Sequence, residues 1–200
     1  MSKSFWDAVK ERRTIYGFEK EKIVSEERIA EIVKDAIKYT PSAFNSQTTR
    51  IVLLFGENNR KFWDITLDVL KKYTPQDQYP NTVNKVNNGF ASGYGTILFY
   101  EDQDIVKNLM DSYPLYKDNF PVWSQHTSAM HQYVIWTALE AEGLGASLQH
   151  YNPIIDSAVA KEWNIPDNWK LIAQMPFGKP LGKPEDKEFS DVDARVRIFK

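Results

Sequence analysis

The feature that most limits the fold of this chain is a set of short apolar runs set between segments of helical periodicity. The first run, IVLLF at residues 51–55, is partly β-branched and too short for a helix. Three more runs that predict strands lie at about 96–100, 146–151 and 170–178. Strands interleaved with helices predict a sheet covered by helices, of the α+β or the α/β class. The strand order stays open.

Helix signals divide the rest of the chain. Ser4, with Asp7 three residues later, resembles a capping box for a helix to about residue 12, and Ser25 begins a second helix that Pro41 ends. Segments 73–81 and 113–123 contain prolines, so we expect a loop in the first and irregular structure in the second. Further helices are predicted at 58–72, 82–88, 104–111, 124–142 and 152–163.

We expect one domain over residues 1–200, because 200 residues is an ordinary length for a single domain. From about residue 179 the chain is polar and then ends in RVRIFK. A polar segment of this kind with an apolar end predicts an arm, over about 179–200, that docks on its own domain or on a partner subunit.

Composition excludes several classes of protein. With 25 basic and 27 acidic residues, the chain lacks the basic excess that is typical of nucleic-acid binders. It has no cysteine, which excludes disulfides, thiolate catalysis and zinc–thiolate sites. The polar N-terminal segment and the lack of a long apolar run predict a cytoplasmic protein without a membrane span. His126 and His131, five residues apart, predict no metal site.

Two stretches in the first quarter of the chain are candidates for a binding site. In ERRTIYGF, residues 11–18, Arg12, Arg13 and Thr14 could bind a phosphate, or the arginines could only complement a helix dipole. In PSAFNSQTTR, residues 41–50, many short polar side chains could bind a ligand or only satisfy the backbone of their own loop. The ring of Phe44 favours the first interpretation slightly, because it needs a surface on which to pack.

Two later stretches are also candidates. Gln149 and His150 in GLGASLQHYNP lie at the end of a predicted strand, just before a predicted helix, where ligands of open α/β sheets bind. His150 could be an acid or base, or only a surface residue. In an extended tail Arg195 and Arg197 would point the same way, towards a phosphate, an acidic surface or solvent. Aromatic residues make up 14% of the chain, which suits an aromatic core or a pocket for a flat ligand.

Taken together, the order of these motifs resembles the nitroreductase family of FMN-dependent flavoenzymes. The order is Arg-x-Thr after the first helix, Pro-Ser-x-x-Asn-x-Gln before a strand, Gly-Leu-Gly at a helix end and a basic pair near the C-terminus. The stretches FASGYGTILFYED and YPLYKDNFPVWS are similar to its small Frm2-like and copper-induced subgroup. The chain departs from many members at Tyr16, at Gln149-His150 and at 175–178.

The resemblance implies an α+β fold with a mainly antiparallel central sheet flanked by helices. It also implies a homodimer in which the two subunits exchange C-terminal arms and form two FMN sites between them. Positions that match FMN-binding positions of the family are Arg12, Arg13, Thr14, Pro41, Ser42, Ala43, Asn45, Gln47, Gln149, Arg195 and Arg197. We expect Phe44, Trp123 and His126 to line the substrate pocket.

The activity that the resemblance implies is two-electron, ping-pong hydride transfer from NADH or NADPH through FMN to a nitroaromatic compound or a quinone. No side chain is predicted to be catalytic, because flavin N5 carries the chemistry. One alternative is a flavin-binding protein of the same fold with a regulatory or stress-response role and little turnover. Another is an aromatic-rich interaction module without a cofactor.

Overall fold

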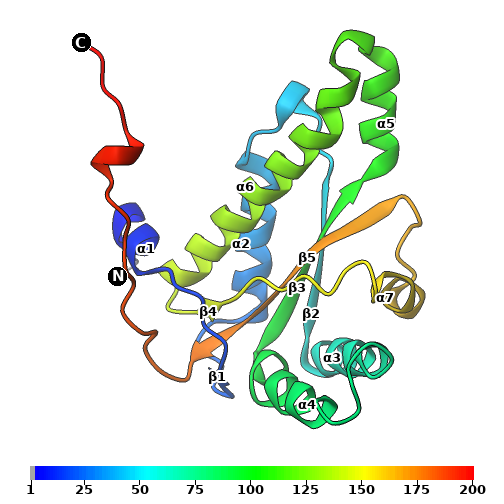
Figure 1. Ribbon diagram of the computed structural model, residues 1–200, viewed down its shortest axis with the longest axis vertical. Helices are drawn as coiled ribbons and strands as arrows, with labels where there is room; N and C mark the ends of the chain where they lie inside the picture. Colours follow the sequence, from blue (N-terminus) through cyan, green and yellow to red (C-terminus); the bar gives the residue numbers. More distant parts are fainter. Residues whose placement is uncertain (1–2) are drawn as a thin grey trace.

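The computed structural model describes residues 3–200 as helices packed on both faces of a sheet (Figure 1). Short 3₁₀ turns, labelled η, connect several of the elements. In chain order the elements are α1 (Phe5–Glu11), β1 (Phe18–Glu19), α2 (Glu26–Tyr39), η1 (Ala43–Asn45), β2 (Thr49–Phe55), α3 (Gly56–Leu70), α4 (Tyr79–Asn88), η2 (Phe90–Ser92), β3 (Gly95–Asp102), α5 (Gln103–Ser112), η3 (Pro114–Asn119), α6 (Phe120–Ala141), β4 (Gly145–Ala146), α7 (Asp156–Trp163), β5 (Trp169–Pro180) and η4 (Asp193–Arg195).

Within the described residues the strands form one five-stranded sheet in the order β1-β5-β3-β2, with β4 also pairing with β5. Every strand pair is antiparallel, which confirms the α+β class and excludes the α/β alternative. Strand β3 is buried along its whole length because β2 and β5 flank it and helices cover both faces. It is therefore the centre of the core.

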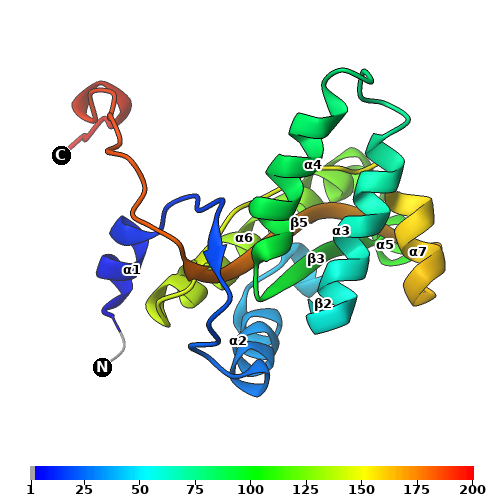
Figure 2. The ribbon, with the colours of Figure 1, turned by 90° about the horizontal axis from the view of Figure 1, so that it is seen from below.

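The side chains of β3 alternate between two apolar layers. Ile97 and Phe99 pack with residues of α2 and α6, whereas Leu98 and Tyr100 pack with residues of α3, α4 and α7. Figure 2 shows α2 separated from α3 and α4 by the strands. The predicted helix signals at the first two helices are confirmed, since Ser4 and Ser25 cap α1 and α2 through their side chains.

Several predicted boundaries were wrong. Of the predicted strand 146–151 only Ala146 lies in a strand, β4, which begins one residue earlier at Gly145. Gln149 still exchanges backbone hydrogen bonds with Gln174 of β5, but Tyr151 N donates to the side chain of Gln174. Helix α7 begins at Asp156, after a turn that contains a cis peptide bond between Asn152 and Pro153.

Three helices begin two or more residues earlier than predicted, and one strand was missed. Helix α3 begins at Gly56, directly after β2. Helix α6 begins at Phe120, with Pro121 in its first turn, where the missing N–H of proline costs no hydrogen bond. Helix α4 takes up the end of the predicted loop 73–81. Strand β1 has only two residues, which is too short to produce a periodic pattern.

The C-terminal segment leaves the body of the protein after β5. Residues 181–200 are all exposed, and both views show them running away from the sheet, past α1 (Figures 1 and 2). Leu181 N donates to Gly17 O, so the segment is tied to the body only near its start. The departure point lies just beyond the predicted boundary near residue 179, because Lys179 and Pro180 still pair with β1.

Candidate functional site

The first predicted group of residues lies where the chain leaves α1 and meets β4. Ile15 N donates to Ala146 O at 2.9 Å, which brings the segment after α1 against the start of the 145–150 segment. A Cβ on Gly145 would lie 2.7 Å from Cγ1 of Ile15, so only glycine allows this approach. Arg12 and Gln149 therefore lie on two segments that adjoin in the fold.

Arg12 has unusual surroundings for an arginine. Its guanidinium lies over the ring of Trp136, 4.4 Å from the ring centroid, and 5.8 Å from that of Tyr133. Its Nε is buried and has no hydrogen-bond partner among residues 3–200. A buried cationic donor normally has an acceptor, so this position is suited to an anionic or hydrogen-bonding ligand. The simpler prediction, that Arg12 only complements the helix dipole, does not account for it.

Arg13 and Thr14 face a different space. They line a cavity of about 750 Å³ between segment 13–17 and the start of the C-terminal arm, at 181–185. Arg13 Nη2 donates to Glu185 O at 2.7 Å, while the side chain of Thr14 is exposed. Arg13 thus contacts the arm of its own chain.

Gln149 and His150 follow β4. Gln149 is half-buried, and its Nε2 donates to Ser147 Oγ at 3.1 Å. Its backbone exchanges two hydrogen bonds with Gln174, which holds the segment against β5. His150 is exposed and makes no side-chain hydrogen bond within the described residues. It therefore shows no contact that would mark it as an acid or base.

The second predicted group, Pro41 to Gln47, forms a tight loop around η1. Three of its residues, Phe44, Asn45 and Gln47, have φ values of 57°, 50° and 48°, a left-handed conformation that is unfavourable for residues other than glycine. Ser42 Oγ accepts a hydrogen bond from Gln47 N at 3.0 Å. The Ser42 hydroxyl thus satisfies a backbone N–H of its own loop, as one of the two interpretations of the sequence predicts. Pro41 and Asn45 are exposed, and Ala43 is half-buried.

Phe44 is the centre of a cluster of five aromatic rings, which we call the aromatic wall. Its ring stacks on Trp123 with a centroid distance of 5.8 Å and an interplanar angle of 20°. It also contacts Tyr113, Tyr116 and Phe120, which sequence reasoning missed. The signal for them was the four aromatic residues in segment 113–123, which indicated only irregular structure. His126 is exposed on α6, and no contact joins it to the wall.

The predicted residues do not meet within one chain. Arg12 packs against Trp136 in the second half of α6, whereas Phe44 packs against Trp123 near its start. Thirteen residues of helix separate these two tryptophans by about 20 Å. Arg195 ends the turn η4 and Arg197 follows it, so the prediction that both lie on one extended segment was wrong. Both arginines are exposed on the arm, and the side chain of Arg195 donates to Ser190 Oγ at 3.4 Å.

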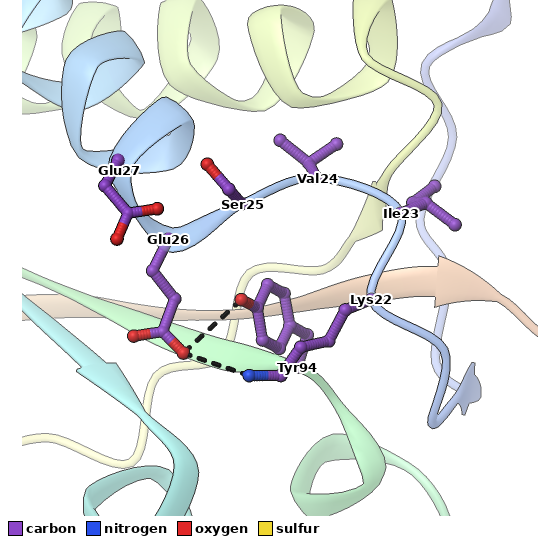
Figure 3. Close-up of a pocket in the computed structure, with 7 residues that line it drawn as sticks. All are labelled: Lys22, Ile23, Val24, Ser25, Glu26, Glu27 and Tyr94. Atoms are coloured by element: carbon purple, nitrogen blue, oxygen red, sulfur yellow. Dashed lines mark hydrogen bonds and ion pairs between the residues drawn. The ribbon is translucent and has the colours of Figure 1, made fainter.

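Another cavity, of about 530 Å³, lies between the start of α2 and Tyr94 (Figure 3). Glu26 Oε1 accepts hydrogen bonds there from Lys22 Nζ at 3.2 Å and from the Tyr94 hydroxyl at 3.4 Å. Burial, the largest cause, and the nearby Glu26 carboxylate raise the pKa of Tyr94. These groups satisfy one another, and no predicted site residue lines this cavity.

Within residues 3–200 no three side chains of the metal-ligating types come together in a way that could hold a metal ion. In the same range, no helix combines the length and the apolar character that crossing a membrane requires.

Comparison with known proteins extends these observations. The model of the nitroreductase family matches residues 9–179. Two Saccharomyces cerevisiae proteins match most of the chain: HBN1 is 35% identical over 187 residues, covering 92% of both chains, and the nitroreductase FRM2 is 31% identical, covering 93% of both. The Lactococcus lactis nitroreductase CinD, solved in complex with chloramphenicol, is 43% identical and superposes with a TM-score of 0.89 over 98% of this chain and 100% of CinD.

These matches include the segments that carry Arg12, the 41–47 loop and the α6–β4 connection, and they extend over both helical layers and the antiparallel sheet. The resemblance noted from the motif order is therefore confirmed at the level of the whole chain, and this protein belongs to the nitroreductase family.

Proposed function

We propose that this protein is an FMN-dependent oxidoreductase that takes hydride from NADH or NADPH and reduces small flat aromatic acceptors, such as nitroaromatic compounds or quinones. The observation that carries the proposal is Arg12, whose buried Nε lacks an acceptor among residues 3–200 and whose guanidinium is held over Trp136. A chain of a flavin-dependent family with such a position fits a cofactor that carries an anionic phosphate and a polar ring edge.

The residues that would hold FMN come from two subunits in this proposal. Arg12, Arg13, Thr14 and Gln149 would bind it from one subunit, and the 41–47 loop from the other. The basic pair Arg195 and Arg197 would supply charge-assisted hydrogen bonds to the phosphate. The separation of the two groups along α6 supports this arrangement, because one chain cannot bring them together.

A homodimer also explains the surface of α6. The apolar residues of this helix are not confined to one face, so packing on the sheet alone does not cover them. Ile135 and Leu139 pack on the sheet, yet Val122, Met130 and Val134 on the same helix are exposed. A second copy of the chain that covers this face would bury it.

Bound FMN would supply the two-electron chemistry at its N5 atom, so that no protein side chain needs to be a nucleophile. The positive charge of Arg12 would stabilise negative charge that develops on the reduced ring. The aromatic wall, from Phe44 to Trp123, would exclude water and stack against a flat acceptor. CinD has been solved with chloramphenicol, with 4-nitrophenol and with nicotinic acid, each of which contains an aromatic ring. His126 stays a predicted pocket residue, and it would line the pocket only if the pocket forms between two subunits.

The test is a spectrum of the purified protein. We expect a yellow protein with flavin absorption that bleaches when NADH or NADPH is added and recovers with a 4-nitroquinoline acceptor. Bleaching without steady NAD(P)H consumption would favour the regulatory alternative. A colourless protein whose melting temperature does not change with added FMN would contradict flavin binding, since a ligand that binds only the native state must stabilise it.

A further inference from the structure

A fully buried carboxylate, Glu101, lies behind the aromatic wall. It has no exposed surface, and no ion pair with a cation is found for it within the described residues. Its Oε1 accepts a hydrogen bond from Thr49 Oγ1 at 2.5 Å, and its Oε2 accepts one from Ser124 Oγ at 2.6 Å. Both distances lie in the range for hydroxyl donors to an ionised carboxylate.

The two hydroxyl groups lie on the two chain segments that carry the stacked rings of the wall. Thr49 is the first residue of β2 and comes two residues after the strained 41–47 loop that carries Phe44. Ser124 directly follows Trp123 in α6. One carboxylate therefore joins the segments that carry the two stacked rings, with one oxygen for each segment.

The loop needs such an anchor, because each left-handed residue other than glycine costs on the order of 1–3 kcal/mol unless the surroundings hold it. Asp102, next to Glu101 on β3, supplies further links. Asp102 N donates to Thr48 O at 2.9 Å, and Asp102 Oδ2 accepts from Arg50 Nη2 at 3.0 Å. Arg50 Nη1 in turn donates to Gln47 O at 2.8 Å. The end of β3 thus fixes the loop from its C-terminal side.

His131 adds a second connection from α6 to the same point. Its Nδ1 lies 2.9 Å from Thr127 O and 3.2 Å from Thr49 Oγ1. A carbonyl oxygen can only accept, so Nδ1 carries a proton, and Thr49 Oγ1, which gives its own proton to Glu101, can also accept. The ring is buried, so the link between β2 and α6 is shielded from water.

Stability alone does not explain a carboxylate at this position. Replacing buried charged groups by apolar side chains of similar volume is often neutral or stabilising, because removing a charge from water is costly. What an apolar side chain cannot provide is a directional link between two segments. We infer that Glu101 is a positioning residue, which sets the spacing between the Phe44 loop and the start of α6 and thereby the shape of the aromatic wall at the acceptor site. This inference rests on the proposed function, in which the aromatic wall lines that site.

The test compares variants that cut each link. Ser124→Ala removes the bond to α6, and Thr49→Val removes the bond to β2 at nearly constant shape. For each we expect the Kd of 4-nitrophenol, measured by quenching of tryptophan fluorescence in the flavin-loaded protein, and the KM of a 4-nitroquinoline acceptor to rise about tenfold, since displacements of about 1 Å have effects of this order or more. Bound flavin per chain and kcat should stay near wild type. The matched control is Ser157→Ala, at an exposed serine of α7.

The triple variant Thr49→Val, Glu101→Met, Ser124→Ala separates positioning from stability. Each single variant leaves a buried partner unsatisfied and should therefore melt at a lower temperature than wild type. Removing all the partners together leaves no buried hydroxyl or charge unsatisfied, so we expect the triple variant to melt closer to wild type while its Kd and KM stay raised. If affinity recovers together with stability, or if the single variants bind with wild-type affinity, the inference is wrong. Wild-type protein that neither binds 4-nitrophenol nor turns over would instead contradict the proposed function.

Discussion

At the scale of single residues, Arg12 shows how burial and hydrogen-bond partners distinguish between roles that the residue type alone leaves open. An arginine near the end of a helix is an ordinary surface feature, and the sequence around Arg12 is compatible with a helix-dipole interaction and with a phosphate contact. Burial of Nε against Trp136 without an acceptor distinguishes the two, because an unsatisfied buried donor is unfavourable. Ser42 shows the converse, since its hydroxyl already bonds within the loop.

Arg197 permits a direct test of the arm. Arg197→Ala should weaken FMN binding, because a charge-assisted hydrogen bond to the phosphate is worth about 1.5–3 kcal/mol. The dissociation constant can be measured by the return of flavin fluorescence on dilution. Lys187→Ala, which removes a cation elsewhere on the same exposed arm, is the matched control and should change little. Unchanged flavin retention in Arg197→Ala would show that the arm does not reach the phosphate.

Asp156 predicts a pH dependence of stability. Its Oδ1 is buried with no partner within the described residues, and this burial raises the pKa of the carboxyl group above its ordinary value of 3.8, with Lys170 opposing the shift. Desolvation therefore outweighs the favourable position at the start of α7. A raised pKa means that the folded state binds more protons than the unfolded state, so stability from this group is present below pH 3.8 and is lost as pH rises through the folded pKa.

Asp156→Asn should remove that dependence. Urea unfolding of both proteins from acid to neutral pH should show the wild type losing stability relative to the variant as pH rises. A constant difference between the two across this range would mean that Asp156 is not desolvated as described.

At the scale of elements, the end of α6 is set by one glycine. Gly143 has φ 84°, with Gly143 N donating to Glu140 O and Leu144 N to Leu139 O, the two hydrogen bonds of a Schellman motif. An added Cβ would meet only Ile23 at 3.7 Å, so the requirement for glycine is conformational and not steric. This end turns the chain into β4 and thus towards Arg12.

Gly143→Ala should lower the free energy of unfolding by about 1–2 kcal/mol, the cost of the left-handed conformation for a residue with a Cβ. Chemical denaturation measures this change. Gly182→Ala is the matched control, since no atom lies within 4 Å of an added Cβ there and its φ is not in the left-handed region. Equal stability of the two variants would contradict the assignment of this cap.

The elements that sequence reasoning placed well are those with long periodic patterns, such as α2 and β2, which local propensity and burial on one face specify together. Strand β1, two residues long, has no pattern of its own and exists only because β5 is there to pair with. The 147–151 segment has the pattern of a strand, and Ser147 N and Gln149 N do donate to backbone oxygens of β5, but Tyr151 N bonds to the buried side chain of Gln174 instead. Such competition between distant groups leaves no local signal.

At the scale of the whole molecule, the arm at residues 181–200 is the part that packs least against the rest of the chain. It exposes apolar side chains that a single chain leaves in water, and we expect a second copy to bury them. The most exposed of them are Leu181, Phe189, Val192, Ile198 and Phe199. Burying each such side chain contributes about 1.5–3 kcal/mol.

Deleting residues 181–200 should therefore separate folding from assembly. The full chain should sediment at about twice its mass of 23.2 kDa, whereas the truncated chain should dissociate on the order of 100-fold more readily and lose flavin, because even two uncovered side chains have an effect of this size. The circular dichroism spectrum of the truncated chain should remain that of a folded protein, since the arm hydrogen-bonds to the body of its own chain near its start. Deleting Lys200 alone is the control. A truncated chain that stays dimeric would contradict arm exchange.

Local sequence patterns were enough to predict a sheet covered by helices, the caps of α1 and α2, and the order of motifs that places the chain in its family. These depend on local periodicity, capping chemistry and residue type, all of which act within a few residues. Three arrangements became visible only in the folded chain: Phe44 contacts four more rings, Glu101 joins Thr49 to Ser124, and the two groups of predicted cofactor residues lie at opposite ends of α6. Those arrangements depend on which side chains distant segments bring together, and no local pattern records that.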